Sequence, residues 1–469
     1  MATEYDVAAV LNILKEKWGP RIVELFNISN DFYDLIWAGP KERMVGKGIR
    51  VPFRYAPNPS GAAGGGKSPI PKAGVSQWDS FLFNSTYYRN RFMLWHEVLD
   101  LSRGEGGFIE GRSNAMMECQ DGVKRMLNTD MLFGRQAGIA TCAGVAAGEG
   151  TTGVVTCKNA YVATLLECRG TRYLTPGQRV QVINPATGAV RARTVADAGV
   201  GVGVFIINTV DSITGVTLDD IPAALADDDI ITRENEFNYP ADGIPTLADP
   251  IGHQLMGLDE IIAASTDVST LLLQNYGGVD RSVRTITQSY VKALGLAGAG
   301  ANLNMKDLRQ AAGGVRAKFG NRGGGLSGPN AAWIVHPAVE EFYYDSIEGD
   351  TRYAPLQARQ GIPTDQQTIN IGDGNKHFAA IDTMPPSALF MVDRGHLERH
   401  TLREIGFDRT GGAVSKQYSS GGNDYDAEWG FMTWGGGLVS DAPNAHAKLL
   451  NIQGIDDLYG QGEDFVVLH

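Results

Sequence analysis

The stretch GAAGGGKSP, residues 61–69, fits the phosphate-loop pattern G-x-x-x-x-G-K-[ST] over Gly61–Ser68. In a nucleotide hydrolase, the backbone amides of this loop and the N-terminus of the helix that follows it face the phosphates. That mechanism needs a strand before the glycines and a helix after them. Here the prolines of RYAPNPS spoil the strand, and Pro69 and Pro71 forbid a sustained helix. The sequence therefore favours a flexible loop, with a P-loop nucleotide hydrolase as the remote alternative.

Two histidines form a second candidate site, because His396 and His400 stand four residues apart with Glu398 between them. This order matches neither H-E-x-x-H nor H-x-x-E-H, the two patterns of zinc proteases. The surrounding stretch ALFMVDRGHLERHTL predicts a strand, in which residues four apart are separated by about 13 Å. Two imidazoles at that distance do not share one zinc ion. We therefore predict surface or interface histidines and no metal site.

No other group of residues forms a catalytic pattern. The run GVGVGVF from Gly199 lacks the G-x-G-x-x-G spacing of a dinucleotide site. Ser327 in GLSGP lacks the preceding glycine of a nucleophile elbow. The sequence thus predicts a protein that is not an enzyme, with no catalytic residue, no cofactor and no metal.

The cysteines and the N-terminus bear on the compartment. The four cysteines form no C-x-x-C pair, which predicts buried thiols in a reducing cytoplasm. The first residues, MATEYDVAAVLNILKEKW, lack the basic start and apolar run of a secretory signal. No run of about 20 apolar residues predicts a membrane span.

The charge of the chain is uneven. Its formal net charge is −12, from 53 acidic and 41 basic residues, so it offers no evenly basic surface to nucleic acid. The segment 41–103 nevertheless contains ten basic and four acidic residues, a net charge of +6 that leaves −18 for the rest. A basic arm on an acidic body is attracted to a neighbouring acidic body.

Hydrophobic periodicity predicts the elements. Helical spacing over 5–37 puts one apolar stripe on a face that packs against the chain's own core or a neighbouring subunit: Val7, Val10, Leu11 and Leu14. Residues 45–98 predict a long two-stranded ribbon with a glycine-rich tip, and 110–133 predict one long helix. Because an isolated ribbon is marginally stable, we expect this one to rest on another surface.

The remaining chain alternates between strands and helices. Residues 150–240 predict a small all-β module. A five-point stripe from Met305 to Phe319 predicts a helix capped by Asn304. Ala331–Val335 predicts a buried strand, followed by a helix with Pro337 at its start.

This order of parts resembles the major capsid proteins of tailed bacteriophages, which share their fold with herpesvirus capsid proteins. GVKRMLNTDMLFGRQAG looks like the spine helix of that family, and TPGQRVQVINPATGAVRARTV with VDSITGVTLDD looks like its β-rich insertion. NLNMKDLRQAAGGVRAKFG and GPNAAWIVHPAVEEFYYDS look like the helix, strand and helix of its axial domain. These stretches span about three quarters of the chain, and the match lies in their order.

The resemblance implies an α+β fold, the phage major capsid fold, with named parts. These are an N-terminal arm over 1–40, an extended β-hairpin loop over 41–103, a peripheral domain with the spine helix over 104–148, a β-rich insertion domain over 149–240, a peripheral return over 241–260, an axial domain over 261–394, and peripheral strands with the C-terminus over 395–469. The implied function is self-assembly into an icosahedral shell that encloses double-stranded DNA.

The resemblance also implies partners. Copies of the chain would form hexamers and pentamers in the host bacterial cytoplasm and end in the virion capsid, with a scaffolding protein, a portal and, in some relatives, a decoration protein. DNA would be enclosed without sequence-specific binding, and no membrane would be involved. We predict no cleaved N-terminal prefix. The alternative within this fold is an encapsulin-like compartment that holds enzyme cargo.

The basic loop and the apolar stripe give the candidate intersubunit contacts. They are Arg50, Arg54, Lys67, Lys72, Arg89 and Arg91 of the loop, with Val7, Val10, Leu11 and Leu14 of the arm. In some family members a loop lysine is joined covalently to an asparagine of the next subunit. For Lys67 and Lys72, ordinary exposed lysines are the simpler interpretation, because no matching asparagine or catalytic glutamate is identifiable.

Overall fold

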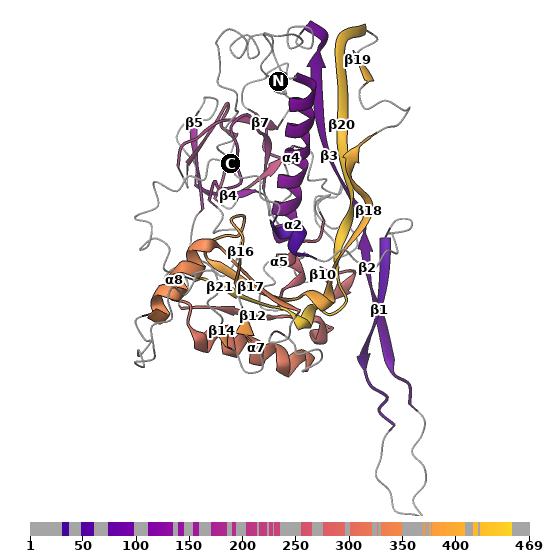
Figure 1. Cartoon of the computed structure of the whole chain (residues 1–469), viewed down its shortest axis with the longest axis vertical. Helices are drawn as coiled ribbons and strands as arrows, with labels where there is room; N and C mark the ends of the chain where they lie inside the picture. Colours follow the sequence, from indigo (N-terminus) through magenta and orange to yellow (C-terminus); the bar gives the residue numbers. More distant parts are fainter. Residues whose placement is uncertain are drawn as a thin grey trace, which may run out of the picture.

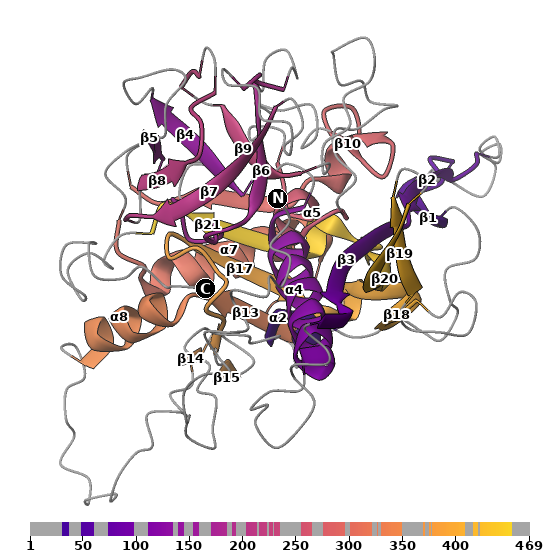
Figure 2. The same cartoon turned by 90° about the horizontal axis from the view of Figure 1, so that it is seen from above.

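The structure is a computed structural model of the 469-residue chain, shown in Figures 1 and 2. It describes residues 31–36, 48–60, 74–97, 111–134, 139–144, 153–158, 170–184, 190–193, 203–212, 215–222, 225–227, 229–234, 255–264, 275–295, 301–320, 326, 330–348, 369–370, 375–376, 378–408, 416–420 and 423–452. Across those ranges no helix is long and apolar enough to span a membrane.

A long helix runs through the upper part of the molecule in Figure 1. This helix, α4 (Gly111–Phe133), confirms the helix predicted over 110–133. Its apolar residues recur every four positions and are buried on one side: Ala115, Cys119, Val123 and Leu127. Met116 and Met126 are partly buried and pack beside the core.

Two glycines let α4 end against a neighbouring segment. Gly134 follows the helix with a φ of +68°, a conformation that favours glycine at a helix C-terminus. A Cβ on Gly134 would collide with the backbone of Gly257, and a Cβ on Gly257 would collide with the backbone of Gly134. This close approach brings α5 (Leu258–Ile261) against the end of α4.

One long sheet packs against α4. It consists of β3 (Thr86–Trp95), β18 (Leu397–Phe407), β19 (Lys416–Ser420) and β20 (Asn423–Ser440). Each of β3, β18 and β19 pairs with β20 in an antiparallel sense. The sheet therefore joins the strand that follows the ribbon to strands more than 300 residues later in the chain.

A second sheet lies below the first in Figure 1, in the order β12-β21-β17-β13-β16. Its strands are β12 (Tyr290–Ala293), β13 (Ala331–Val335), β16 (Phe378–Ala380), β17 (Ala388–Asp393) and β21 (Ala447–Leu450). Two helices accompany it, α7 (Met305–Phe319) and α8 (Pro337–Glu348). The predicted strand Ala331–Val335 and the two predicted helices are confirmed. The predicted cap is confirmed as well, because the side-chain oxygen of Asn304 accepts a hydrogen bond from the N–H of Asp307 at 3.1 Å.

The β-rich stretch folds into a closed barrel in the order β4-β5-β8-β7-β6-β9. Its strands are β4 (Ala140–Gly144), β5 (Gly153–Cys157), β6 (Arg179–Ile183), β7 (Val204–Val210), β8 (Gly215–Leu218) and β9 (Ile230–Arg233). Alternate side chains fill the interior, including Val155, Val180, Phe205 and Ile231. Closure of the barrel leaves it no free sheet edge.

The structure also contains several shorter elements. They are α2 (Asp31–Leu35), β10 (Asn275–Tyr276), β11 (Val279–Asp280), β14 (Ile369–Asn370), β15 (Asn375–Lys376) and the 3-10 turns η3 (Thr285–Thr287), η6 (Arg394–His396) and η7 (Pro443–Ala445). Of these, α2 lies within the helix predicted over 5–37, whose earlier residues are outside the described ranges.

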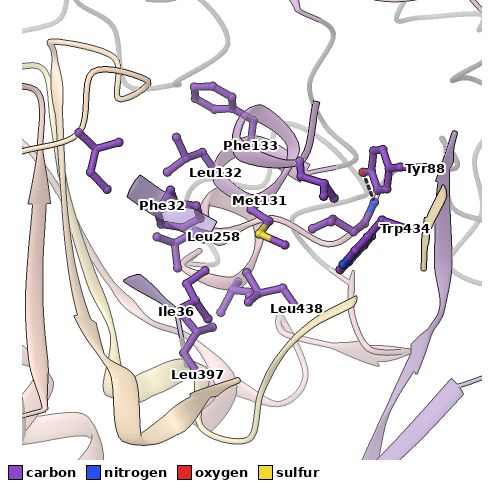
Figure 3. Close-up of a cluster of buried hydrophobic side chains, with 14 of the residues drawn as sticks. Phe32, Ile36, Tyr88, Met131, Leu132, Phe133, Leu258, Leu397, Trp434 and Leu438 are labelled. Carbon is purple, nitrogen blue, oxygen red and sulfur yellow. Dashed lines mark hydrogen bonds between the residues drawn. The ribbon is translucent and has the colours of Figure 1, made fainter. Parts of the chain in front are cut away.

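The main core lies where these parts meet. Figure 3 shows Phe32 of α2, Met131 of α4, Leu258 of α5 and Trp434 of β20 converging on one cluster. Burying a large apolar side chain contributes roughly 1.5–3 kcal/mol. The cluster therefore fixes α4, the long sheet and α5 to one another.

Strand pairing differs from the predicted grouping of the chain in three places. The prediction placed residues 140–144 in the peripheral domain, but β4 pairs with β5 and β9 of the barrel. The prediction placed residues 447–450 with the peripheral strands, but β21 pairs with β12 and β17 of the second sheet. The prediction also placed β3 within the extended loop, but β3 pairs with β20. Strand partners are set by tertiary packing, which local periodicity does not encode.

A buried histidine links these strands and makes stability depend on pH. The ring of His446 is fully buried, its Nδ1 accepting from the N–H of Asp393 at 3.2 Å and its Nε2 lying 2.9 Å from the hydroxyl of Ser440. Burial lowers the pKa of His446 to about 3, helped by nearby His396 and opposed by Asp441.

We expect the free energy of unfolding to fall as the pH decreases from about 6.5 towards 3, because the unfolded chain then binds a proton at His446 that the folded chain excludes. His446→Gln should flatten this dependence in urea unfolding of the unassembled chain at several pH values. The same substitution at His96 is the comparison, because the hydrogen bond to Asp426 raises the pKa of His96, so its loss should change the pH dependence in the opposite sense. An unchanged pH dependence in His446→Gln would contradict the assignment.

Candidate intersubunit surface

The ribbon consists of β1 (Gly48–Ala56) and β2 (Gln77–Asn84), paired antiparallel as predicted. Its inner face is held by aromatic contacts. The rings of Phe53 and Phe81 stack with their centroids 4.2 Å apart, and Phe81 and Phe83 each meet the ring of Tyr276 edge to face at 4.9 and 5.3 Å. Figures 1 and 2 both place the ribbon at the side of the molecule opposite the barrel.

A tight backbone contact and a cation also anchor the inner face. The N–H of Leu82 donates to the carbonyl of Gly277 at 2.8 Å, and a Cβ on Gly277 would press on Phe81. The guanidinium of Arg284 lies 4.0 Å from the ring centroid of Tyr55, and its Nε is 3.6 Å from a carboxylate oxygen of Asp79. These contacts hold the inner face of the ribbon against the rest of the subunit, which leaves the opposite face of the ribbon exposed.

That other face is exposed and mixes cations with apolar groups. The register places Arg50 opposite Leu82 and Arg54 opposite Trp78. Trp78 is 63% exposed and Leu82 is 44% exposed, while both arginines are exposed as well. We call Arg50, Arg54, Trp78 and Leu82 the outer ribbon face. Large apolar side chains exposed on one face are typical of a surface that binds another protein.

A second exposed surface lies on the long sheet. Tyr87, Arg89 and Arg91 alternate along β3 and so share one face. The guanidinium of Arg91 lies 4.9 Å from the ring centroid of Trp429, and the Trp429 ring stacks on Phe431 at 5.9 Å. We call these five residues the sheet patch. Arginine and aromatic side chains are enriched in protein interfaces, and the patch is rich in both.

Four of the predicted contact residues thus fall on two exposed surfaces. Arg50 and Arg54 lie on the outer ribbon face, and Arg89 and Arg91 lie on the sheet patch. The other six fall outside the residues that the structure describes: Lys67, Lys72, Val7, Val10, Leu11 and Leu14. The glycine-rich stretch Gly61–Ser68 is also outside them.

The charge pattern of the sequence did not identify the apolar and aromatic residues of these two surfaces. Trp78 and Leu82 alternate with buried phenylalanines in β2, so period-two alternation around Phe81 could have identified them. Trp429 had no such signal, because only the fold brings it beside Arg91.

The two histidines of the GHLERH stretch do not form one site. Nδ1 of His396 lies 2.9 Å from a carboxylate oxygen of Asp441, whereas Nε2 of His400 lies 3.1 Å from Glu398. Within the described ranges, no three histidine, cysteine or acidic side chains are grouped to hold a metal ion. Cys119, Cys142 and Cys157 are buried free thiols, as predicted, while Cys168 lies outside those ranges.

No protein-family model matches the sequence of the chain, and no curated protein matches it. Solved structures do match. A chain of the cyanophage A-1(L) capsid asymmetric unit aligns over 94% of this chain and 98% of its own, with 9% identity and a TM-score of 0.54. The chain of the native GTA particle capsid aligns over 95% and 98% with 10% identity and a TM-score of 0.44, and that of the myovirus XM1 capsid over 94% and 98% with 8% identity and a TM-score of 0.42.

The architecture therefore belongs to a recognisable class. The chain has an α+β fold of the phage-capsid type, as the resemblance implied. The cyanophage A-1(L) capsid chain shares that fold along nearly its whole length. At this low identity the likeness establishes the fold, and the function needs the argument that follows.

Proposed function

We propose that this chain is the major capsid protein of a tailed bacteriophage and that copies of it assemble into an icosahedral shell around double-stranded DNA. The observation that supports this most is the fold shared with a phage capsid chain over 94% of the sequence. The same similarity covers 98% of the cyanophage chain, so it extends over nearly the whole length of both chains.

The outer ribbon face gives a physical reason for assembly. Covering Trp78 and Leu82 with a neighbouring subunit would remove large apolar side chains from water, at roughly 25 cal/mol for each Å². Arg50 and Arg54 on the same face would meet the acidic surface of that neighbour, since the chain outside 41–103 has a net charge of −18. Many modest contacts repeated by symmetry then hold a closed shell.

The remaining predicted contacts follow from the same proposal. Arg89 and Arg91 of the sheet patch, Lys67 and Lys72 of the loop, and the apolar stripe Val7, Val10, Leu11 and Leu14 are proposed to contact neighbouring subunits. The subunits would form hexamers and pentamers with a scaffolding protein and a portal, assembling in the host cytoplasm. An acidic wall encloses DNA without holding it tightly, because phosphates are bound by basic side chains.

The proposed domain boundaries are those implied by the resemblance, with the three changes that strand pairing requires. The axial domain then takes β21, and the peripheral domain takes β3. The barrel is the proposed insertion domain, beginning with β4 at residue 140.

Electron microscopy of the purified chain, expressed with and without its scaffolding protein, tests the proposal. Uniform closed particles are the expected result. Closed particles that contain enzyme cargo in place of DNA would favour an encapsulin-like compartment. A monomer under all conditions, with or without the scaffold, would contradict the proposal.

A further inference from the structure

A cavity of about 460 Å³ opens where the barrel meets the rest of the molecule. Its wall combines residues of α4, β3 and the barrel strands β6 and β9 with the turn at 382–383. Cavities of this size hold small-molecule ligands in many proteins. Arg89 of the wall also belongs to the sheet patch, while the other residues of the wall lie outside the two proposed contact surfaces.

Arginines are prominent in the wall. Among the wall residues that the structure describes, the basic ones are Arg89 of β3, Arg125 of α4, Arg179 of β6 and Arg233 of β9, and the acidic ones are Glu234 and Asp382. Three separate parts of the fold therefore contribute arginines to one wall.

Two of these arginines are held by carboxylates. Nε of Arg179 lies 2.6 Å from Glu234, and the guanidinium of Arg233 lies 3.0 Å from Asp130, which stands beside the cavity. These pairs fix the positions of the two guanidiniums. Among the described residues, the four arginines of the wall are accompanied by Glu234, Asp382 and the neighbouring Asp130, and Asp121 beside Arg125 is shared with Lys124.

The positive charges of Arg125 and Arg233 also repel each other. Burial lowers the pKa of Arg125, Asp121 raises it, and the charge of Arg233 lowers it again. Two cations that are partly removed from water and close to each other are stabilised by an anion between them. Guanidinium groups bind phosphate and carboxylate groups through paired hydrogen bonds, so either group satisfies this geometry.

The rest of the wall suits an organic polyanion. Asn90, Thr129, Thr175 and Gln178 carry polar side chains, while Met126, Tyr173 and Pro176 add apolar surface. The Tyr173 hydroxyl donates to the carbonyl of Thr383 at 2.7 Å, which fastens the barrel to the second sheet at the edge of the cavity. A ligand bound here would touch every part that meets at this joint.

We propose that the cavity is a binding site for a small polyanion bearing phosphate or carboxylate groups, held by Arg89, Arg125, Arg179 and Arg233. Its occupancy would stiffen the joint between the barrel and the spine helix. The wall of the cavity comes from one chain, so binding can be measured on the unassembled subunit.

Thermal unfolding of the unassembled full-length chain tests the site, with tripolyphosphate and citrate titrated at constant ionic strength. We expect a saturable rise of Tm with at least one of the two probes, and the more effective probe identifies phosphate or carboxylate as the preferred group. In Arg125→Gln the apparent Kd should rise at least tenfold. Arg54→Gln removes the same charge from the outer ribbon face and should bind as the wild type does.

Arg89→Gln is the second variant, since Arg89 is exposed and its replacement leaves the core intact. It should also weaken binding, so the test stands even where Arg125→Gln fails to fold. A Tm that does not respond to either probe would overturn the proposal. So would an equal response in the wild type and both cavity variants.

Discussion

Replacing Arg50 and Arg54 together by glutamate is expected to abolish shell formation while the subunit stays folded. Both side chains are exposed and lie on the outer ribbon face beside Trp78 and Leu82. The double change reverses the charge of that face, so it would meet the acidic neighbour with repulsion. Because each subunit contributes the same contact, the loss is repeated at every interface of the shell.

The measurement is the particle yield by sedimentation and electron microscopy, with circular dichroism to report folding. We expect at least a tenfold loss of particles and an unchanged spectrum. Arg50→Lys with Arg54→Lys keeps the charge and should assemble. Lys306→Glu with Arg309→Glu makes the same charge reversal on the exposed side of α7 and controls for net charge. Normal assembly of the Arg50/Arg54 glutamate variant would refute the role of this face.

Asp259→Ala is expected to cost about 3–5 kcal/mol of the free energy of unfolding. The ammonium of Lys448 lies 3.0 Å from a carboxylate oxygen of Asp259, and both residues are buried, at 3% and 4% exposure. Removing the carboxylate takes away the counterion that lies 3.0 Å from the buried ammonium of Lys448. The pair also joins α5 to β21, so its loss weakens the connection between the main core and the second sheet.

Urea unfolding of the unassembled chain measures this cost. The double variant Asp259→Ala with Lys448→Met removes both charges and should recover most of the loss, because an apolar side chain replaces the ammonium. Asp211→Ala, on the surface of the barrel, is a control for removal of a carboxylate outside the core. A cost below about 1 kcal/mol for Asp259→Ala would show that the buried pair does not hold the two parts together.

The sequence predicted the elements whose cause is local. The stripe and cap of Met305–Phe319 and the apolar spacing of Gly111–Phe133 are properties of a few consecutive turns, and both helices formed as expected. The partners of β3 and β21 were not predictable in this way. Each of these strands pairs with segments far along the chain, which depends on the packing of the whole core.

The two candidate intersubunit surfaces also combine residues that the sequence could predict with residues that it could not. Charge alone pointed to Arg50 and Arg91, since a basic segment on an acidic chain is visible in the sequence. The aromatic side of the sheet patch was missed, because Trp429 reaches Arg91 only through the pairing of β20 with β3. The arginine cavity was missed for the same reason, as its wall comes from separate parts of the fold.

A cryo-electron microscopy reconstruction of particles assembled from this chain tests the central claim most directly. The account predicts a closed icosahedral shell in which the outer ribbon face of each subunit lies against the next subunit. Particles in which the ribbon contacts only its own subunit, or a chain that never forms a closed shell even with its scaffolding protein, would contradict it.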